Sequence, residues 1–303
     1  MNDNGTMVQV AVTDLAGYFD DEITAMPNLI TVGATGTATS VAGIPFFSDI
    51  SNNSIYTHDV SGTDNTAEGN TAFGVGALDA ITTGDYNTAV GFGALTAQQT
   101  GEGNVAIGQA ALNANTDSNN LAVGKSALLV NTSGTRNIAI GNRTNDLADT
   151  ESHNLAIGYE AMTGAVAGGE YNVAIGNYTL DALTSADYVT AVGYNAGSSI
   201  DTGGYNTFIG YGSGDALTDA DGNVGVGHDT LGSNVHGDRN TAVGYGALRT
   251  HTVASKSDVG NTAMGWAAGA EVTTGDGNTL IGHQAYATGS GNLTTGSSNV
   301  AIG

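Results

Sequence analysis

The chain has 303 residues, and 47 of them are glycine while only two are proline. This glycine share is about twice the ~7 % found in ordinary soluble proteins. Collagen is excluded because it needs glycine at every third position together with abundant proline. Aromatic residues make up 6 % of the chain, which is too few for the bulky core of a typical two-domain enzyme.

The charge is strongly acidic, with 29 acidic and 6 basic residues and a formal net charge of −23. Residues 1–124 contain no Lys or Arg, so a role in neutralising nucleic-acid phosphates is excluded. Cysteine is absent, which removes disulfides, thiolate metal sites and cysteine nucleophiles.

The first residues lack the basic and apolar regions of a secretory signal, and no stretch approaches the ~18 apolar residues of a membrane span. We therefore expect a soluble chain that is made without Sec export and does not insert into membranes.

Residues 1–64 form a distinct N-terminal region. Thr13 and Asp14 can cap a short helix that ends near Pro27. Two short β-prone runs, 29–32 and 44–47, follow it. We predict that this region attaches the protein to a partner or aligns the chains of a trimer.

From residue 65 onward the sequence repeats. The pentad Asn-x-(small)-(aliphatic)-Gly recurs at a spacing of mostly 17 residues, and Val189 replaces the Asn in one copy. Its fourteen glycines are Gly74, Gly91, Gly108, Gly124, Gly141, Gly158, Gly176, Gly193, Gly210, Gly227, Gly244, Gly265, Gly282 and Gly303. The last copy ends at the final residue, so we expect the shaft to continue into a further C-terminal domain.

A period of 17 residues is too short for a βαβ unit or a helical hairpin and fits two short strands and two turns. The columns of small and apolar residues predict parallel stacking of coils, and an antiparallel meander is the weaker alternative. Strand geometry places the first and third residues after Asn on one face and the second on the other. The third residue is always large and apolar, as at Val243, and we expect this column to be buried.

The Asn that begins each pentad and the Gly that ends it recur for structural reasons. We expect the glycine to turn the chain at positive φ or to admit a close backbone approach, and the Asn to form an inward amide ladder along the coil axis. Representative Asn and Gly pairs are Asn87 and Gly91, Asn104 and Gly108, Asn137 and Gly141, and Asn240 and Gly244.

These pentads, for example Asn104-Val105-Ala106-Ile107-Gly108, resemble the repeats of trimeric autotransporter adhesin heads of the YadA type. The resemblance covers about residues 65–303 and implies an all-β, left-handed parallel β-roll of about 14 coils that forms a homotrimer. The period is longer than the 14-residue coil of that family, which implies extended loops on one edge.

Similar repeats occur in bacteriophage tail fibres, often in the form seen from Asn240 to Leu248. The expected function is therefore a non-enzymatic virion tail-fibre shaft that serves host attachment and, like other phage fibres, is made in the host cytoplasm. Its expected partners are two further copies of the chain, a tail or baseplate protein bound by the N-terminal region, and a host surface glycan or protein. The alternatives are a bacterial surface adhesin and a polysaccharide-degrading tailspike.

One column is a candidate recognition surface. The residue directly after the pentad glycine is aromatic in six consecutive coils, and stacking these rings at coil spacing would form a ladder. The ladder either stabilises the roll or the trimer seam or presents an aromatic stripe to a receptor glycan. Its members are Tyr194, Tyr211, His228, Tyr245, Trp266 and His283. Two long inserts, 250–260 with His251 and Lys256, and 288–298, are further candidates.

No catalytic motif is found. The six histidines lack metal-binding spacings, and no serine lies in a Gly-x-Ser-x-Gly elbow. Asp219 and Asp221 could form a hydrolase pair, although solvated turns are the simpler interpretation. The same segment offers oxygen ligands for calcium, but without an established calcium motif we expect no cofactor or metal. An ice-binding solenoid is a weaker alternative function. A flat array of Thr would be needed to bind ice, and the Thr column after Asn is interrupted over residues 105–173.

Overall fold

The computed structural model describes residues 39–41, 44–49, 54–56, 66–164, 167–286 and 294–303. The helix expected near residues 13–27 and the strand expected at 29–32 lie outside this part of the chain. The run 44–47 is part of strand β2 (Ile44–Asp49), as predicted. Strand β2 pairs antiparallel with β1 (Thr39–Val41) and with β3 (Ser54–Tyr56).

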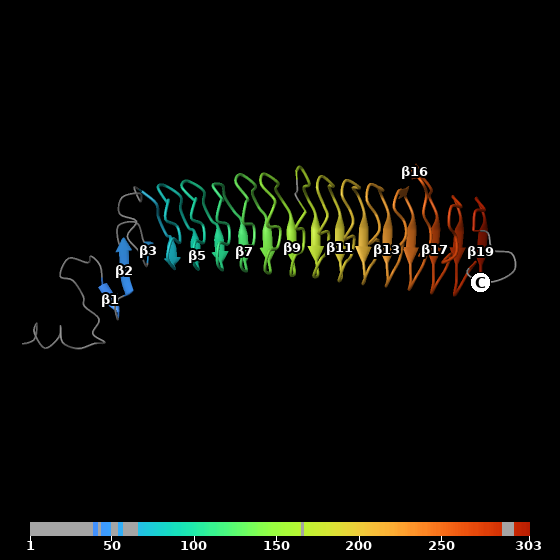
Figure 1. Cartoon of the computed structure of the whole chain (residues 1–303), viewed down its shortest axis with the longest axis horizontal. Coiled ribbons are helices and arrows are strands. Elements are labelled where there is room, and N and C mark those ends of the chain that lie inside the picture. The colour runs from blue at the N-terminus through green and yellow to red at the C-terminus, as the bar shows by residue number, and fades with distance from the viewer. Residues whose placement is uncertain (1–38, 42–43, 50–53, 57–65, 165–166, 287–293) are drawn as a thin grey trace, which may run out of the picture.

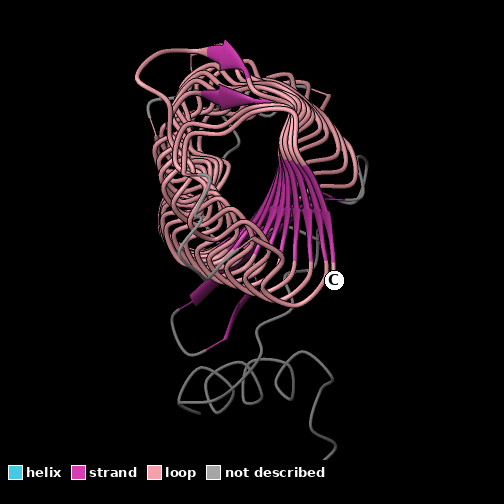
Figure 2. Ribbon diagram, turned by 90° about the vertical axis from the view of Figure 1, so that its right-hand side faces the viewer, coloured by secondary structure: helices cyan, strands magenta, loops and turns pink. Residues whose placement is uncertain are grey.

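The repeats form a parallel β-solenoid drawn out into a rod (Figure 1). Most coils contain one short strand and not the two that the period predicts, because the segment after the glycine turns through residues at positive φ such as Leu95. Figure 2, viewed along the rod, shows these strands stacked on one side of the coil while turns complete the circuit. The fourteen strands are β4 (Thr71–Phe73), β5 (Thr88–Val90), β6 (Val105–Ile107), β7 (Leu121–Val123), β8 (Ile138–Ile140), β9 (Leu155–Ile157), β10 (Val173–Ile175), β11 (Thr190–Val192), β12 (Thr207–Ile209), β13 (Val224–Val226), β15 (Thr241–Val243), β17 (Thr262–Met264), β18 (Thr279–Ile281) and β19 (Val300–Ile302).

Each strand pairs in parallel with the strand of the next coil, and the register keeps equivalent residues side by side. Thr190, Ala191 and Val192 of β11, for example, face Thr207, Phe208 and Ile209 of β12. The parallel solenoid predicted from the repeat is therefore confirmed. A second, two-stranded parallel sheet joins β14 (Gly237–Asp238) to β16 (Ser257–Asp258) in the first long insert.

The strands bury their central residue and direct the other two outward. Ala242 in β15 is completely buried, while Thr241 and Val243 are only half-buried. The expectation that the large apolar column lies in the core was therefore wrong for the single chain. Strand geometry correctly separates the two faces, but the inward position is the one that holds the small residue, which is Ala in most coils.

Phe208 is an informative exception because it occupies an inward position that is alanine in most coils. Its ring is completely buried and lies where two glycines leave space. A Cβ on Gly214 would lie 2.5 Å from the Phe208 ring, and one on Gly225 would lie 2.9 Å from it. In most other coils the place of Gly214 is filled by Leu or Met, so Phe208 fills the volume that this side chain would otherwise take.

The pentad glycine is required both by its turn and by the stacking of coils. Gly91 has φ +134°, and a Cβ there would lie 2.5 Å from the carbonyl oxygen of Gly108 in the next coil. Gly108 and Gly124 repeat this relationship along the rod. Any larger residue would both strain the backbone and push two coils apart.

The asparagines form a buried ladder inside the rod. The backbone N–H of Asn104 donates to Oδ1 of Asn87 at 2.9 Å, and that of Asn240 donates to Oδ1 of Asn223 at 2.9 Å. The side-chain amide also donates to a backbone carbonyl, as from Asn87 to Gly101 at 2.9 Å. Each side chain thus satisfies polar groups that water cannot reach.

An inward apolar column lies in the turns, four residues after the pentad glycine in most coils. Leu95, for example, is completely buried although its φ is +51°, a backbone conformation that costs about 1–2 kcal/mol in a residue with a Cβ. Burying a Leu side chain contributes about 1.5–3 kcal/mol, so the interior contact offsets the strain. The same arrangement recurs at Leu78, Leu112, Leu128, Met162, Leu180, Leu231 and Leu248.

The core divides into two clusters along the rod, one ending at Ala139 and the other beginning at Ala148. In the coil between them Asn145 takes the place of the inward Leu. Asn145 is completely buried, and neither polar atom of its side chain has a hydrogen-bond partner in the described structure. This polar coil separates the two apolar cores.

Candidate functional site on the outer face of the solenoid

The rings that follow the pentad glycine form a continuous stack, which we call the post-glycine column. Neighbouring ring centroids are 5.4 Å apart between Tyr194 and Tyr211 and 4.9 Å apart between Tyr211 and His228. The stack continues from His228 to Tyr245 at 5.0 Å. Trp266 follows Tyr245 at 6.0 Å and precedes His283 at 4.9 Å. All six predicted rings are thus brought together at coil spacing.

The column extends towards the N-terminus with a different geometry. Tyr178 lies between Tyr159 and Tyr194 and meets both rings edge-on, at centroid distances of 5.6 and 5.7 Å. Tyr178 is the second residue after its pentad glycine, so it falls outside the column as read from the sequence. It fills the gap that Asn177 leaves at the aromatic position.

A second stack lies at the other end of the strands and was missed by sequence reasoning. We call it the pre-asparagine column, because its residues directly precede the buried Asn position. His153 stacks on Tyr171 at 4.7 Å, and Tyr171, Tyr188 and Tyr205 follow at 5.2 Å each. The signal was present as Tyr at this fixed offset in three consecutive coils.

Between the two columns runs a band that we call the outer stripe, made of the first and third residues of the fourteen repeat strands. In β12 the sequence of outward residues is Tyr205, Thr207, Ile209 and Tyr211, so aromatic columns flank the stripe on both sides. Many of its large side chains are exposed, including Phe73 at 52 %, Ile209 at 42 % and Met264 at 47 %. The stripe holds no charged residue in any of these strands.

The orientation of the rings limits what the post-glycine column can bind. The stacked pairs have interplanar angles of 8–18°, so an inner ring turns both faces towards its neighbours. A sugar that stacks on an aromatic residue needs a free ring face. Inner rings of the column therefore offer edges, hydroxyl groups and ring nitrogens to a ligand.

Carboxylates line the turn beside the post-glycine column. Burial raises the pKa of Asp181 above its ordinary value. Burial also raises the pKa of Asp215, and the neighbouring Asp229 carboxylate adds to this effect. Burial raises the pKa of Asp146 too, although the ion pair of Asp146 with Arg143 at 3.2 Å opposes this change. The proton affinity of this edge is thus higher than that of ordinary surface acids.

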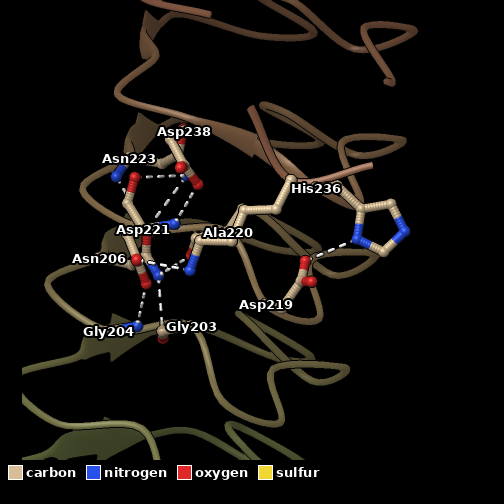
Figure 3. A network of polar contacts seen from close by, with 10 residues as sticks. Gly203, Gly204, Asn206, Asp219, Ala220, Asp221, Asn223, His236 and Asp238 are labelled. Atoms are coloured by element: carbon tan, nitrogen blue, oxygen red, sulfur yellow. Dashed lines mark hydrogen bonds and ion pairs between the residues drawn. The ribbon is translucent and has the colours of Figure 1, made fainter. Parts of the chain in front are cut away.

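The two acids considered as a hydrolase pair point to different partners (Figure 3). Asp219 lies 2.6 Å from Nδ1 of His236, while Oδ1 of Asp221 accepts from the backbone N–H of Gly204 at 2.9 Å. Nζ of Lys256 donates to the other oxygen of Asp221 at 2.6 Å. These carboxylates serve as links between coils and do not face each other as a hydrolase pair would.

The insert 250–260 also separates its two candidate residues. Lys256 folds back onto Asp221, whereas His251 lies inside the rod and is completely buried. Neither ring nitrogen of His251 meets a hydrogen-bond partner in acceptable geometry. Burial lowers the pKa of His251, and the backbone of Gly275 and the charge of Asp276 oppose this only partly. His251 is thus a core residue and cannot serve a surface site.

Within the described residues, no group of three or more His, Asp or Glu side chains is arranged to hold a metal ion. The same part of the chain contains no helix long and apolar enough to cross a membrane. The chain matches no family model, no curated protein and no solved structure.

Proposed function

We propose that this chain forms the shaft of a homotrimeric virion tail fibre, a left-handed β-roll without enzymatic activity that supports attachment to a host cell. The observation that carries the proposal is the outer stripe. It is uncharged, consists of large apolar residues and Thr, and is at least partly exposed in every repeat strand of a rod that is otherwise strongly acidic. Single soluble chains rarely leave such a continuous apolar band in water.

The charge of the chain favours association through the stripe rather than through ion pairs. Three chains together carry three times −23, a formal charge of −69. Any contact made by their acidic edges would be repulsive, whereas the stripe brings no like charges together. Partly exposed β-branched and Leu residues in register supply the apolar surface that an obligate interface needs.

The rod shape supports a role as a spacer. Fourteen coils at the ~4.8 Å spacing of neighbouring strands give a shaft of roughly 65 Å. Such a shaft would hold a distal tip away from a particle, while the region 1–64 would dock on a tail or baseplate protein. The receptor would be a glycan or protein of the host surface.

Two measurements test this proposal. Immunogold labelling of purified virions with an antibody against the rod is expected to mark tail fibres, while label found only on bacterial surfaces would support the adhesin alternative instead. Incubation with host capsule or lipopolysaccharide is expected to release no oligosaccharide. Released oligosaccharide would identify a tailspike and contradict the non-enzymatic assignment.

A further inference from the structure

A shallow hollow lies beside the post-glycine column where Tyr245 and Trp266 stack. It has a volume of about 150 Å³ and coincides with the widest spacing among the six stacked rings, 6.0 Å between these two centroids. We propose that this hollow binds one neutral sugar ring. The inference rests on the proposed role in host attachment and names the ligand chemistry of that role.

Small residues in the lining leave space for the hollow. Gly246, Ala267 and Ala270 line it, and a Cβ built on Gly246 would meet no atom within 4 Å. Two coils earlier the places of Gly246 and Arg249 are taken by Gly212 and Asp215, and the next coil has Asp229 and Gly232 there. The acidic residues that line this edge elsewhere are therefore replaced at the hollow.

Long polar side chains also line the hollow and determine which class of ligand it would bind. Arg249, Glu271 and Gln284 line the hollow together with the two rings. The guanidinium supplies donors, the carboxylate supplies acceptors, and the amide supplies both. One positive and one negative group leave the site without net charge, which suits a ligand with many hydroxyl groups and no charge of its own.

The ring geometry is consistent with edge contacts rather than face stacking. Both faces of Tyr245 and Trp266 lie against neighbouring rings of the column. The sugar would therefore rest against the ring edges while its hydroxyl groups bond to Arg249, Glu271 and Gln284. The small volume limits the site to a single ring, because sites for larger ligands usually occupy ~300–1,000 Å³.

The chain contains one tryptophan, and it is Trp266, so its fluorescence reports directly on the hollow. We expect titration with neutral monosaccharides (glucose, galactose and N-acetylglucosamine) to give a saturable change for at least one of them. Half-saturation near ~1 mM is expected for a small ligand with few contacts. No saturable change with any of the three, or a response confined to an acidic sugar such as sialic acid, would overturn the proposal.

Variants assign the response to the hollow. Arg249→Gln and Glu271→Gln should each weaken binding by about tenfold or more, because each removes a charge-assisted hydrogen bond. Lys125→Gln, which removes a positive charge from an exposed position in a distant coil, should bind as the wild type does. Equal binding by all variants would place the sugar elsewhere and contradict the inference.

Failure of this test can be distinguished from failure of the proposed function. Sedimentation and immunogold labelling use no sugar, so they can support a trimeric tail fibre even when the titration is negative. A positive titration with label absent from tail fibres would retain the sugar site and reject the virion role.

Discussion

Ala242 and Val243 are neighbours in strand β15, yet Ala242 is completely buried inside the solenoid while Val243 lies on the outer stripe. This pair shows which face of the repeat packs inside the single chain and which face is available to other chains. The interior is lined by alanine on this wall, and the larger side chains point away from it.

The first prediction separates these two faces. Ala242→Leu should destabilise the folded chain by about 1–3 kcal/mol, because the added atoms overpack the interior. In the monomeric state, Val243→Thr, the matched control on the outer face, should change the free energy of unfolding by no more than ~0.5 kcal/mol, whereas in the trimer it should weaken association. Urea unfolding measures both, under conditions where the oligomeric state of the two variants is the same. Equal effects would mean that the faces are assigned incorrectly.

The second prediction concerns Phe208 and Gly214. Phe208→Ala alone should cost about 3–5 kcal/mol through the cavity that it leaves. Gly214→Leu alone should also destabilise, because a Cβ on Gly214 would lie 2.5 Å from the Phe208 ring.

The double variant restores the Ala and Leu pair found in other coils. We expect it to be more stable than Phe208→Ala alone, with a coupling energy within the ~0.5–3 kcal/mol found for residues in contact. Additive effects in this double-mutant cycle would show that the two side chains do not share one volume.

The third prediction concerns the single gap in the asparagine ladder. The backbone N–H of Val189 donates to Oδ1 of Asn172 at 2.9 Å, but Val189 has no side-chain oxygen to offer to Asn206 in the next coil. Val189→Asn should complete the ladder and stabilise the chain by about 1 kcal/mol. Thermal unfolding measures the gain. Val189→Leu is the control without an amide, and an equal gain from it would rule out the hydrogen bond as the cause.

The fourth prediction concerns pH. Burial lowers the pKa of His251 below its ordinary value of 6.5, so in mildly acidic solution the unfolded chain binds a proton that the folded chain does not. The contribution of neutral His251 is complete above about pH 6.5 and is lost as the pH falls from that value towards the lowered pKa.

Unfolding free energies of the wild type and of His251→Leu should therefore diverge below about pH 6.5, with the variant losing less stability. Taking the difference between the two proteins removes the contribution of Asp146, Asp181 and Asp215, whose raised pKa values act in the opposite direction. Parallel pH profiles would mean that His251 is protonated equally in both states.

Much of the fold could be predicted because the repeat places each residue type in a column. Asn104 and Gly108 recur at a fixed spacing, and only parallel stacking brings such residues into register. The orientation of Val243 could not be predicted in the same way. Alternation determines which residues share a face, but the width of the coil determines which face lies inside.

The candidate site was predicted only in part. The post-glycine rings were found because six of them follow one another without a gap. Tyr178 was missed because it is displaced by one position, and the hollow beside Trp266 was missed because it depends on the small size of Gly246 and Ala270 from different coils. Contacts between coils of this kind follow from three-dimensional packing and leave no motif in the sequence.

The central claim is that the outer stripe joins three chains, and sedimentation equilibrium of the wild-type protein at micromolar concentration tests it most directly. We predict a single species with three times the 30.2 kDa mass of the chain. A monomer that persists across the concentration range would contradict the claim, because it would mean that the exposed apolar stripe remains in contact with water.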